Sequence, residues 1–94
     1  MDGLPPEELL ESVHSFPGSY QIKAIGEVDD DFPGRVLAAV LEEVSGPGEV
    51  DLSLRETKGG RHVAVTMAVT VQSSRQVLAI YARIREVRGL TLLL

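Results

Sequence analysis

The alternating stretches on either side of the adjacent glycines Gly59 and Gly60 constrain the fold of this chain more than any other feature. Before the glycines, Val50, Leu52 and Leu54 alternate with polar residues, and residues 63–71 alternate large apolar with small ones. A period of two is typical of strands with one buried face. Adjacent glycines also adopt readily the positive φ values that hairpin turns require. We therefore predict a β-hairpin with a two-residue loop at Gly59-Gly60.

This loop position sets the pairing of the two strands, predicted over residues 49–57 and 61–72. It places Leu54 opposite Val65 and Leu52 opposite Met67. The large apolar side chains of both strands then share one face, whereas a slip of one residue would scatter them. The other face of the second strand carries small or polar residues: His62, Ala64, Thr66, Ala68 and Thr70.

Three further elements and a final strand are predicted from the positions of glycine and proline and from the spacing of apolar residues. Residues 20–28 read as a strand with Val28 facing inward, in which Gly26 predicts a bulge or a close backbone approach. A first helix starts within residues 29–34, carries apolar residues as far as Val44 and stops at 45–48, which is rich in glycine and proline. A second helix runs from Ser73 to about residue 88. The apolar residues 90–94 predict a last strand inside the sheet, with Leu93 near the uncovered face.

The order β-α-β-β-α-β predicts an α+β fold, the ferredoxin-like plait. This plait has a four-stranded antiparallel sheet with both helices on one face, and right-handed crossovers place its first and third strands at the centre. Residues 1–15 predict a short N-terminal helix, since Pro5 and Pro6 suit a helix start and Glu7 and Glu8 its positive end. We expect residues 16–94 to form a single domain.

Composition excludes several classes of function. The formal net charge is −5, which argues against binding of nucleic acid through basic patches. The uncovered face predicted above carries no aromatic residue on which RNA bases could stack. The chain has no cysteine, which rules out disulfides and thiolate chemistry and fits a reducing cytoplasm. Neither a signal peptide nor an apolar run long enough to cross a membrane is evident, so we expect a cytoplasmic protein without membrane contact.

No pattern indicates catalysis, a metal or a cofactor. His14 and His62 are the only imidazoles, and neither has a His or Cys partner at metal-ligand spacing. The three aspartates at 29–31 lack the central glycine and terminal glutamate of a calcium loop. Residues 58–61 combine two cations with two glycines, for which a charged hairpin tip is favoured over an anion site. We therefore expect a protein that is not an enzyme, with no catalytic residue, no metal and no cofactor.

The chain resembles the YbeD-like family of small bacterial proteins of unknown function. The resemblance rests on the order and spacing of these residues: Phe16-Pro17, Tyr20, Lys23 and Gly26, Lys58-Gly59 with His62, Gln76-Val77 and Ile80-Tyr81. It implies the same plait, similar to ACT regulatory domains, and a family for which a link to lipoate metabolism has been suggested without an established activity. Residues 29–34 depart from the family by being richer in acid, proline and glycine.

Two functional hypotheses follow. The first is a regulatory or adaptor domain that binds a protein partner, or itself, through strand edges or the uncovered face, whose candidate residues are Lys23, Ile25, His62, Ala64, Thr66 and Ala68. The second rests on the ACT-like opening of the first helix, where an amino acid or organic acid effector would bind at a turn comprising Gly26, Asp29, Asp31 and Gly34. Helix N-termini suit carboxylates, but these aspartates would repel an anion, and capping of the helix by aspartate explains the same residues.

Overall fold

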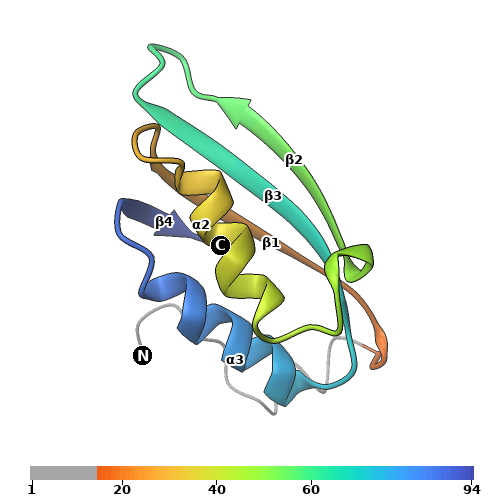
Figure 1. The fold of residues 1–94 in the computed structure, drawn as a ribbon. Helices are drawn as coiled ribbons and strands as arrows, with labels where there is room; N and C mark the ends of the chain where they lie inside the picture. The colour runs from red at the N-terminus through yellow and green to blue at the C-terminus, as the bar shows by residue number, and fades with distance from the viewer. Residues whose placement is uncertain (1–14) are drawn as a thin grey trace.

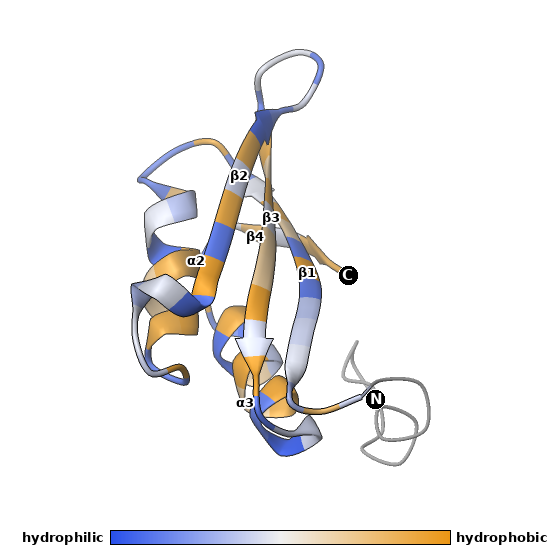
Figure 2. Ribbon diagram, turned by 90° about the vertical axis from the view of Figure 1, so that its right-hand side faces the viewer, coloured by the Kyte–Doolittle hydropathy of each residue, from blue (hydrophilic) through white to orange (hydrophobic). Residues whose placement is uncertain are grey.

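The computed structural model describes residues 15–94, which form one antiparallel sheet covered on one face by two helices (Figures 1 and 2). The elements are β1 (Gly18–Glu27), α2 (Phe32–Leu41), the short 3-10 helix η1 (Pro47–Glu49), β2 (Val50–Glu56), β3 (His62–Val71), α3 (Ser74–Arg85) and β4 (Leu90–Leu93). The strand order is β2-β3-β1-β4, with β1 and β3 central. This confirms the predicted ferredoxin-like plait. The predicted N-terminal helix falls on residues outside the described part.

The register of the β2–β3 hairpin is the predicted one, with Leu54 opposite Val65 and Leu52 opposite Met67. Its loop is longer than predicted. The last hydrogen bond across the hairpin runs from the Thr57 N–H to the His62 carbonyl at 2.9 Å, so residues 58–61 form the loop. Gly59 and Gly60 both have positive φ, +96° and +71°. The register is still the predicted one because the loop is longer by the same number of residues before Gly59 and after Gly60.

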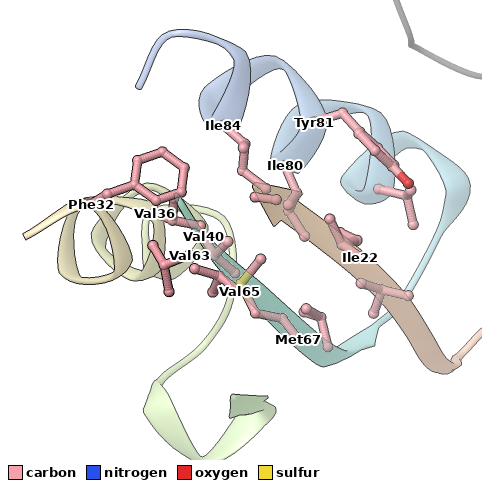
Figure 3. Close-up of a cluster of buried hydrophobic side chains, with 14 residues drawn as sticks. Ile22, Phe32, Val36, Val40, Val63, Val65, Met67, Ile80, Tyr81 and Ile84 are labelled. Carbon is pink, nitrogen blue, oxygen red and sulfur yellow. The ribbon is translucent and has the colours of Figure 1, made fainter. Parts of the chain in front are cut away.

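The core lies between the sheet and the two helices (Figure 3). Alternate residues of β1 and β3 point toward the helices, and the apolar stripes of α2 and α3 close over them. The largest fully buried side chains are Phe32, Ile22, Met67, Ile80, Ile84, Val36, Val40, Val65, Val69, Val71 and Val77. Burying each side chain of this size contributes roughly 1.5–3 kcal/mol, so this layer holds the fold together.

Gly26 combines both features that its place in the strand predicts. A Cβ added there would lie 2.4 Å from ring carbons of Phe32, so the ring occupies the space that any other side chain would need. The pairing of β1 with β4 also shifts register between Ile25 and Gly26, which marks a bulge. Glycine at this position therefore lets the first residue of α2 pack directly against the β1 backbone.

Both helices begin at side-chain caps. Asp31 caps α2, since its carboxylate accepts a hydrogen bond from the Gly34 N–H at 3.2 Å, and Ser73 caps α3 through the Gln76 N–H. Helix α2 ends at Leu41, earlier than predicted. The next N–H groups bond three residues back, Glu42 to Ala39 and Glu43 to Val40, which tightens and closes the last turn before Val44.

Two sequence expectations, for the last strand and for Val28, are wrong. β4 lies at an edge of the sheet, because the crossover through α3 places it beside β1, whose other side is taken by β3. Val28 is exposed rather than inward because β1 ends at Glu27. Leu54 faces the helix side but stays 54% exposed, since the hairpin extends past the N-terminal end of α2 (Figure 1).

Candidate functional site

The sheet surface turned away from the helices, here called the open face, is not covered by any described element (Figure 2). Directly paired residues of neighbouring antiparallel strands lie on the same face, so the register maps this surface as rows. One row runs Arg55, Ala64, Ile25 and Leu92, from β2 to β4. The next row runs Ser53, Thr66 and Lys23. The centre of the face is therefore built from small side chains between longer ones.

The structure brings the six residues predicted for this face together. They are Lys23, Ile25, His62, Ala64, Thr66 and Ala68, all half-buried and all on β1 or β3. His62 lies at the end of the face, paired with Glu27, while the other five occupy the three central rows. Their shared face follows from the register, and their role in an interaction remains a prediction.

The sequence reasoning missed the part of the face contributed by β4. It placed Leu93 there, but Leu93 pairs with Ala24 on the covered face. Leu92, opposite Ile25, is 48% exposed on the open face instead. Leu94 follows it, 59% exposed, with its N–H and carbonyl bonded to the Lys23 backbone. Residues 92–94 are all leucine, so no alternation signalled which of them faces outward.

Two shallow hollows lie on the open face. The first, here called the cationic hollow, has a volume of about 290 Å³ and is lined by Lys23, Ile25, Arg55, Glu56, Thr57, Lys58 and Ala64. The second, of about 340 Å³, is lined by Gln21, Asp51, Leu52, Ser53, Thr66 and Ala68. Both are at the lower limit for small-molecule pockets, and they suit side chains of a partner better than a large cofactor.

Three of the four residues predicted for the ligand turn, Gly26, Asp31 and Gly34, are used within the fold. The Phe32 ring fills the space beside Gly26, and the Asp31 carboxylate packs against Gly34 as the cap of α2. Asp29 is exposed and lines a separate hollow of about 460 Å³ with Arg61 and His62. These contacts explain Gly26, Asp31 and Gly34 without a ligand, and binding of an effector at this turn stays a prediction.

Two cations on the helix side, Arg83 and Arg88, form close ion pairs within the chain. Arg83 contacts carboxylate oxygens of Glu42 and Glu43, both at 2.7 Å, and Arg88 contacts Asp30 at 2.6 Å. The hydrogen bond to Glu43, followed by the charge of Glu42, raises the pKa of Arg83. Arg35 donates to the backbone carbonyls of Asp30 and Arg88, at 2.8 and 2.7 Å, and so ties two loops together.

The pKa of the Tyr81 phenol is raised for a structural reason. Burial, then a hydrogen bond with Tyr20, raises the pKa of its phenol. The two rings pack edge to face with centroids 6.3 Å apart, and the Tyr81 hydroxyl donates to the Leu94 carbonyl at 3.3 Å.

Among residues 15–94 there is no group of three potential metal ligands. The helices of the same region are all too short or too polar to cross a bilayer.

Comparison with known proteins places this geometry in a family. The family model described as "Protein of unknown function (DUF493)" matches residues 11–94. A UPF0250 protein of Shewanella piezotolerans is 32% identical over 83 residues, which are 88% of each chain. A UPF0250 protein of Chromobacterium violaceum is 36% identical over 75 residues, or 80% of each chain.

Solved structures share the fold at low sequence identity. The ACT domain from the GTP pyrophosphokinase of Chlorobium tepidum superposes with a TM-score of 0.61 at 10% identity, covering 81% of this chain and 94% of that one. The C-terminal domain of MgtC from Mycobacterium tuberculosis superposes with a TM-score of 0.59 at 14% identity, covering 86% and 87%. The YbeD-like resemblance is thereby confirmed: the chain belongs to the DUF493 family of bacterial UPF0250 proteins, whose function is unknown and whose fold is ACT-like.

Proposed function

We propose that this protein is a non-enzymatic regulatory or adaptor domain that binds another protein through the open face of its sheet. The observation that carries the proposal is the uncovered centre of that face. There the small residues Ala64, Thr66 and Ala68 lie beside Ile25 and the exposed Leu92. Small side chains allow another layer of polypeptide to approach closely, and apolar neighbours favour its burial.

The chemistry of the face favours a polypeptide as its occupant. The surface combines apolar, hydroxyl and charged side chains within three rows, a mixture typical of transient protein interfaces. It offers no aromatic ring for stacking a base, and the net charge of −5 opposes a nucleic acid backbone. Beside the face, the edges of β2 and β4 provide strands that an extended partner segment could continue.

The structural neighbour from Chlorobium tepidum is the ACT domain of a GTP pyrophosphokinase, so the plait occurs there as one domain of an enzyme. That setting fits a domain that works by contact with other polypeptide, although 10% identity carries the likeness of fold alone.

The test compares two charge-altering variants in affinity capture from a bacterial extract. Thr66→Arg places a long cation at the centre of the open face, and Arg75→Glu changes an exposed residue in the first turn of α3, where a carboxylate is tolerated. We expect a specific partner to be retained by the wild type and Arg75→Glu and lost by Thr66→Arg. Equal capture by all three would contradict the proposal. Sedimentation of the purified wild type as a dimer that Thr66→Arg dissociates would identify self-association as the use of this face instead.

A second candidate is an ACT-like sensor of an amino acid or organic acid. It is favoured by the ACT-like fold and by the hollow that Asp29, Arg61 and His62 line together. Titration with amino acids and organic acids should then move the amide resonances of residues 29–35. Unchanged resonances with every compound would reject the sensor and leave the protein-binding proposal intact.

A further inference from the structure

The cationic hollow combines an apolar floor with a charged rim. Ala64 lies in β3 directly between Arg55 on β2 and Ile25 on β1, so a short side chain stands between two long ones and leaves the depression. Lys23 lies one row away on the same face of β1, and Lys58 is the first residue of the hairpin loop. Neighbouring strands are about 4.8 Å apart, so the side chains of three separate segments reach one small area.

The rim cations differ from Arg83 and Arg88 on the helix side. Lys23, Arg55 and Lys58 make no ion pair within residues 15–94, whereas Arg83 and Arg88 bind in-chain carboxylates at 2.6–2.7 Å. Glu56 also lines the hollow, although its pairing with Val63 places it on the opposite face of β2 from Arg55. Three cations against one carboxylate leave this corner positive on a chain whose net charge is −5.

The size and chemistry of the hollow define what fits it. A volume of about 290 Å³ accepts one or two side chains rather than a nucleotide or a cofactor. The cations of the rim favour a negatively charged group. The floor of Ile25 and Ala64 favours an apolar group next to that charge. Arginine and lysine bind carboxylates through charge-assisted hydrogen bonds, which strengthen when a partner excludes water from the site.

Resting on the protein-binding function proposed above, we propose that the cationic hollow recognises an acidic segment of the partner protein, in which glutamate or aspartate residues flank an apolar residue. The apolar side chain contacts Ile25 and Ala64, and the flanking carboxylates pair with Lys23, Arg55 and Lys58. Recognition then depends on charge complementarity at the hairpin end of the open face, while the rest of the face supplies contact area.

The test uses a fluorescein-labelled peptide in which leucines alternate with pairs of glutamates, and a second peptide with lysine in place of each glutamate. We expect the acidic peptide alone to bind, with amide shifts concentrated at Lys23, Ile25, Arg55 and Ala64. The variant Arg55→Glu/Lys58→Glu should weaken binding at least tenfold, whereas Arg75→Glu should leave it unchanged. Raising the salt from 0.05 to 0.5 M should weaken binding in the wild type, because exposed ion pairs are screened.

Several outcomes would overturn the inference: no binding of the acidic peptide at millimolar concentration, equal binding of the lysine peptide, or unaltered affinity in the double variant. Equal competition by a thymidine oligonucleotide would instead assign the hollow to a nucleic acid. Both exchanged side chains are exposed, so thermal unfolding of the double variant should match the wild type and exclude misfolding. If Thr66→Arg abolishes partner capture and the double variant does not, the open-face function stands and the acidic-segment inference falls.

Discussion

The two faces of the sheet come from alternate residues of the same strands, and they differ in nearly every physical respect. On β3, Val65 and Met67 are fully buried against the helices, whereas Ala64 and Thr66, their immediate neighbours in sequence, are half-buried on the open face. The covered face is large, apolar and closed by α2 and α3. The open face has small side chains and mixed polarity, and it is bordered by cations that make no ion pair within residues 15–94.

This difference separates the residues that stabilise the fold from the residues that we propose to bind a partner. Filling the space under the helices accounts for most of the free energy of folding, so the covered face tolerates little change in volume. The open face contributes little to that packing, so its residues can be exchanged at little cost in stability. Substitutions on the two faces should therefore have opposite signatures, and the following predictions run from the largest expected effect on stability to the smallest.

Phe32→Ala removes a fully buried ring that packs against the β1 backbone at Gly26. We expect the free energy of unfolding to fall by about 3–5 kcal/mol, because a large cavity is left beside a strand that cannot collapse into it. Urea unfolding followed by circular dichroism measures the change, with Phe32→Leu as a smaller truncation. A loss below about 1 kcal/mol would show that this contact is not part of the core.

Gly26→Ala places a Cβ where the Phe32 ring stands. We expect a loss of about 1–3 kcal/mol, the range for overpacking a closed core. The same change in a Phe32→Leu background should cost less, since the smaller side chain leaves room for the methyl group. Additive effects of the two substitutions would mean that the glycine is needed for another reason, such as the backbone geometry of the bulge.

Tyr81 makes stability depend on alkaline pH. Burial raises the pKa of its phenol above the ordinary value of about 10, so above pH 10 the unfolded chain releases a proton that the native protein retains. Stability should therefore be intact below pH 10 and fall as pH rises beyond it, by up to about 1.4 kcal/mol per pH unit. Urea midpoints at pH 9, 10 and 11 should fall more steeply for the wild type than for Tyr81→Phe. Parallel slopes would contradict this reading.

Asp31→Ala removes the cap of α2 and leaves a β-carbon at a φ of +52°. We expect a loss of about 1 kcal/mol. Asp31→Gly should cost less, because glycine accepts this backbone conformation and is itself an adequate cap. Equal losses in the two variants, measured by thermal unfolding, would argue that the carboxylate acts through something other than capping.

Arg55→Glu/Lys58→Glu and Thr66→Arg alter the open face alone. We expect the free energy of unfolding to stay within about 0.5 kcal/mol of the wild type in each, as for surface changes away from the core. The same denaturation measurements check this. A loss comparable to that of Gly26→Ala would break the contrast between the faces and show that the open face is part of the stabilising structure.

Much of this architecture could be predicted from local sequence. The period of two assigned successive residues of the segment 63–71 alternately to the two faces. The adjacent glycines placed the hairpin so that its predicted register was right, even though the loop was longer than predicted. Ser73 and the aspartates before Phe32 marked both helix starts. These signals are readable because each depends on neighbours within a few residues: alternation, turn conformation and capping are local properties of the chain.

The candidate site was only half predictable, because its remaining parts depend on contacts between distant segments. A run of leucines has no alternation, so only pairing with β1 decided that Leu92 faces outward and Leu93 inward. Likewise, Arg88 looks as free as Arg55 in the sequence, yet packing of loops 58 residues apart neutralises it with Asp30.

By itself, the sequence determined the order of the elements, the two faces of the central strands and the absence of cysteine chemistry, because these follow from composition and short-range patterning. Only the tertiary structure decided that Leu54 lies beyond the cover of the helices, and which cations around Ala64 make no ion pair within the described residues 15–94. Burial and ion pairing are properties of the assembled layers, and they arise when the crossovers bring α2, α3 and β4 to their places on the sheet.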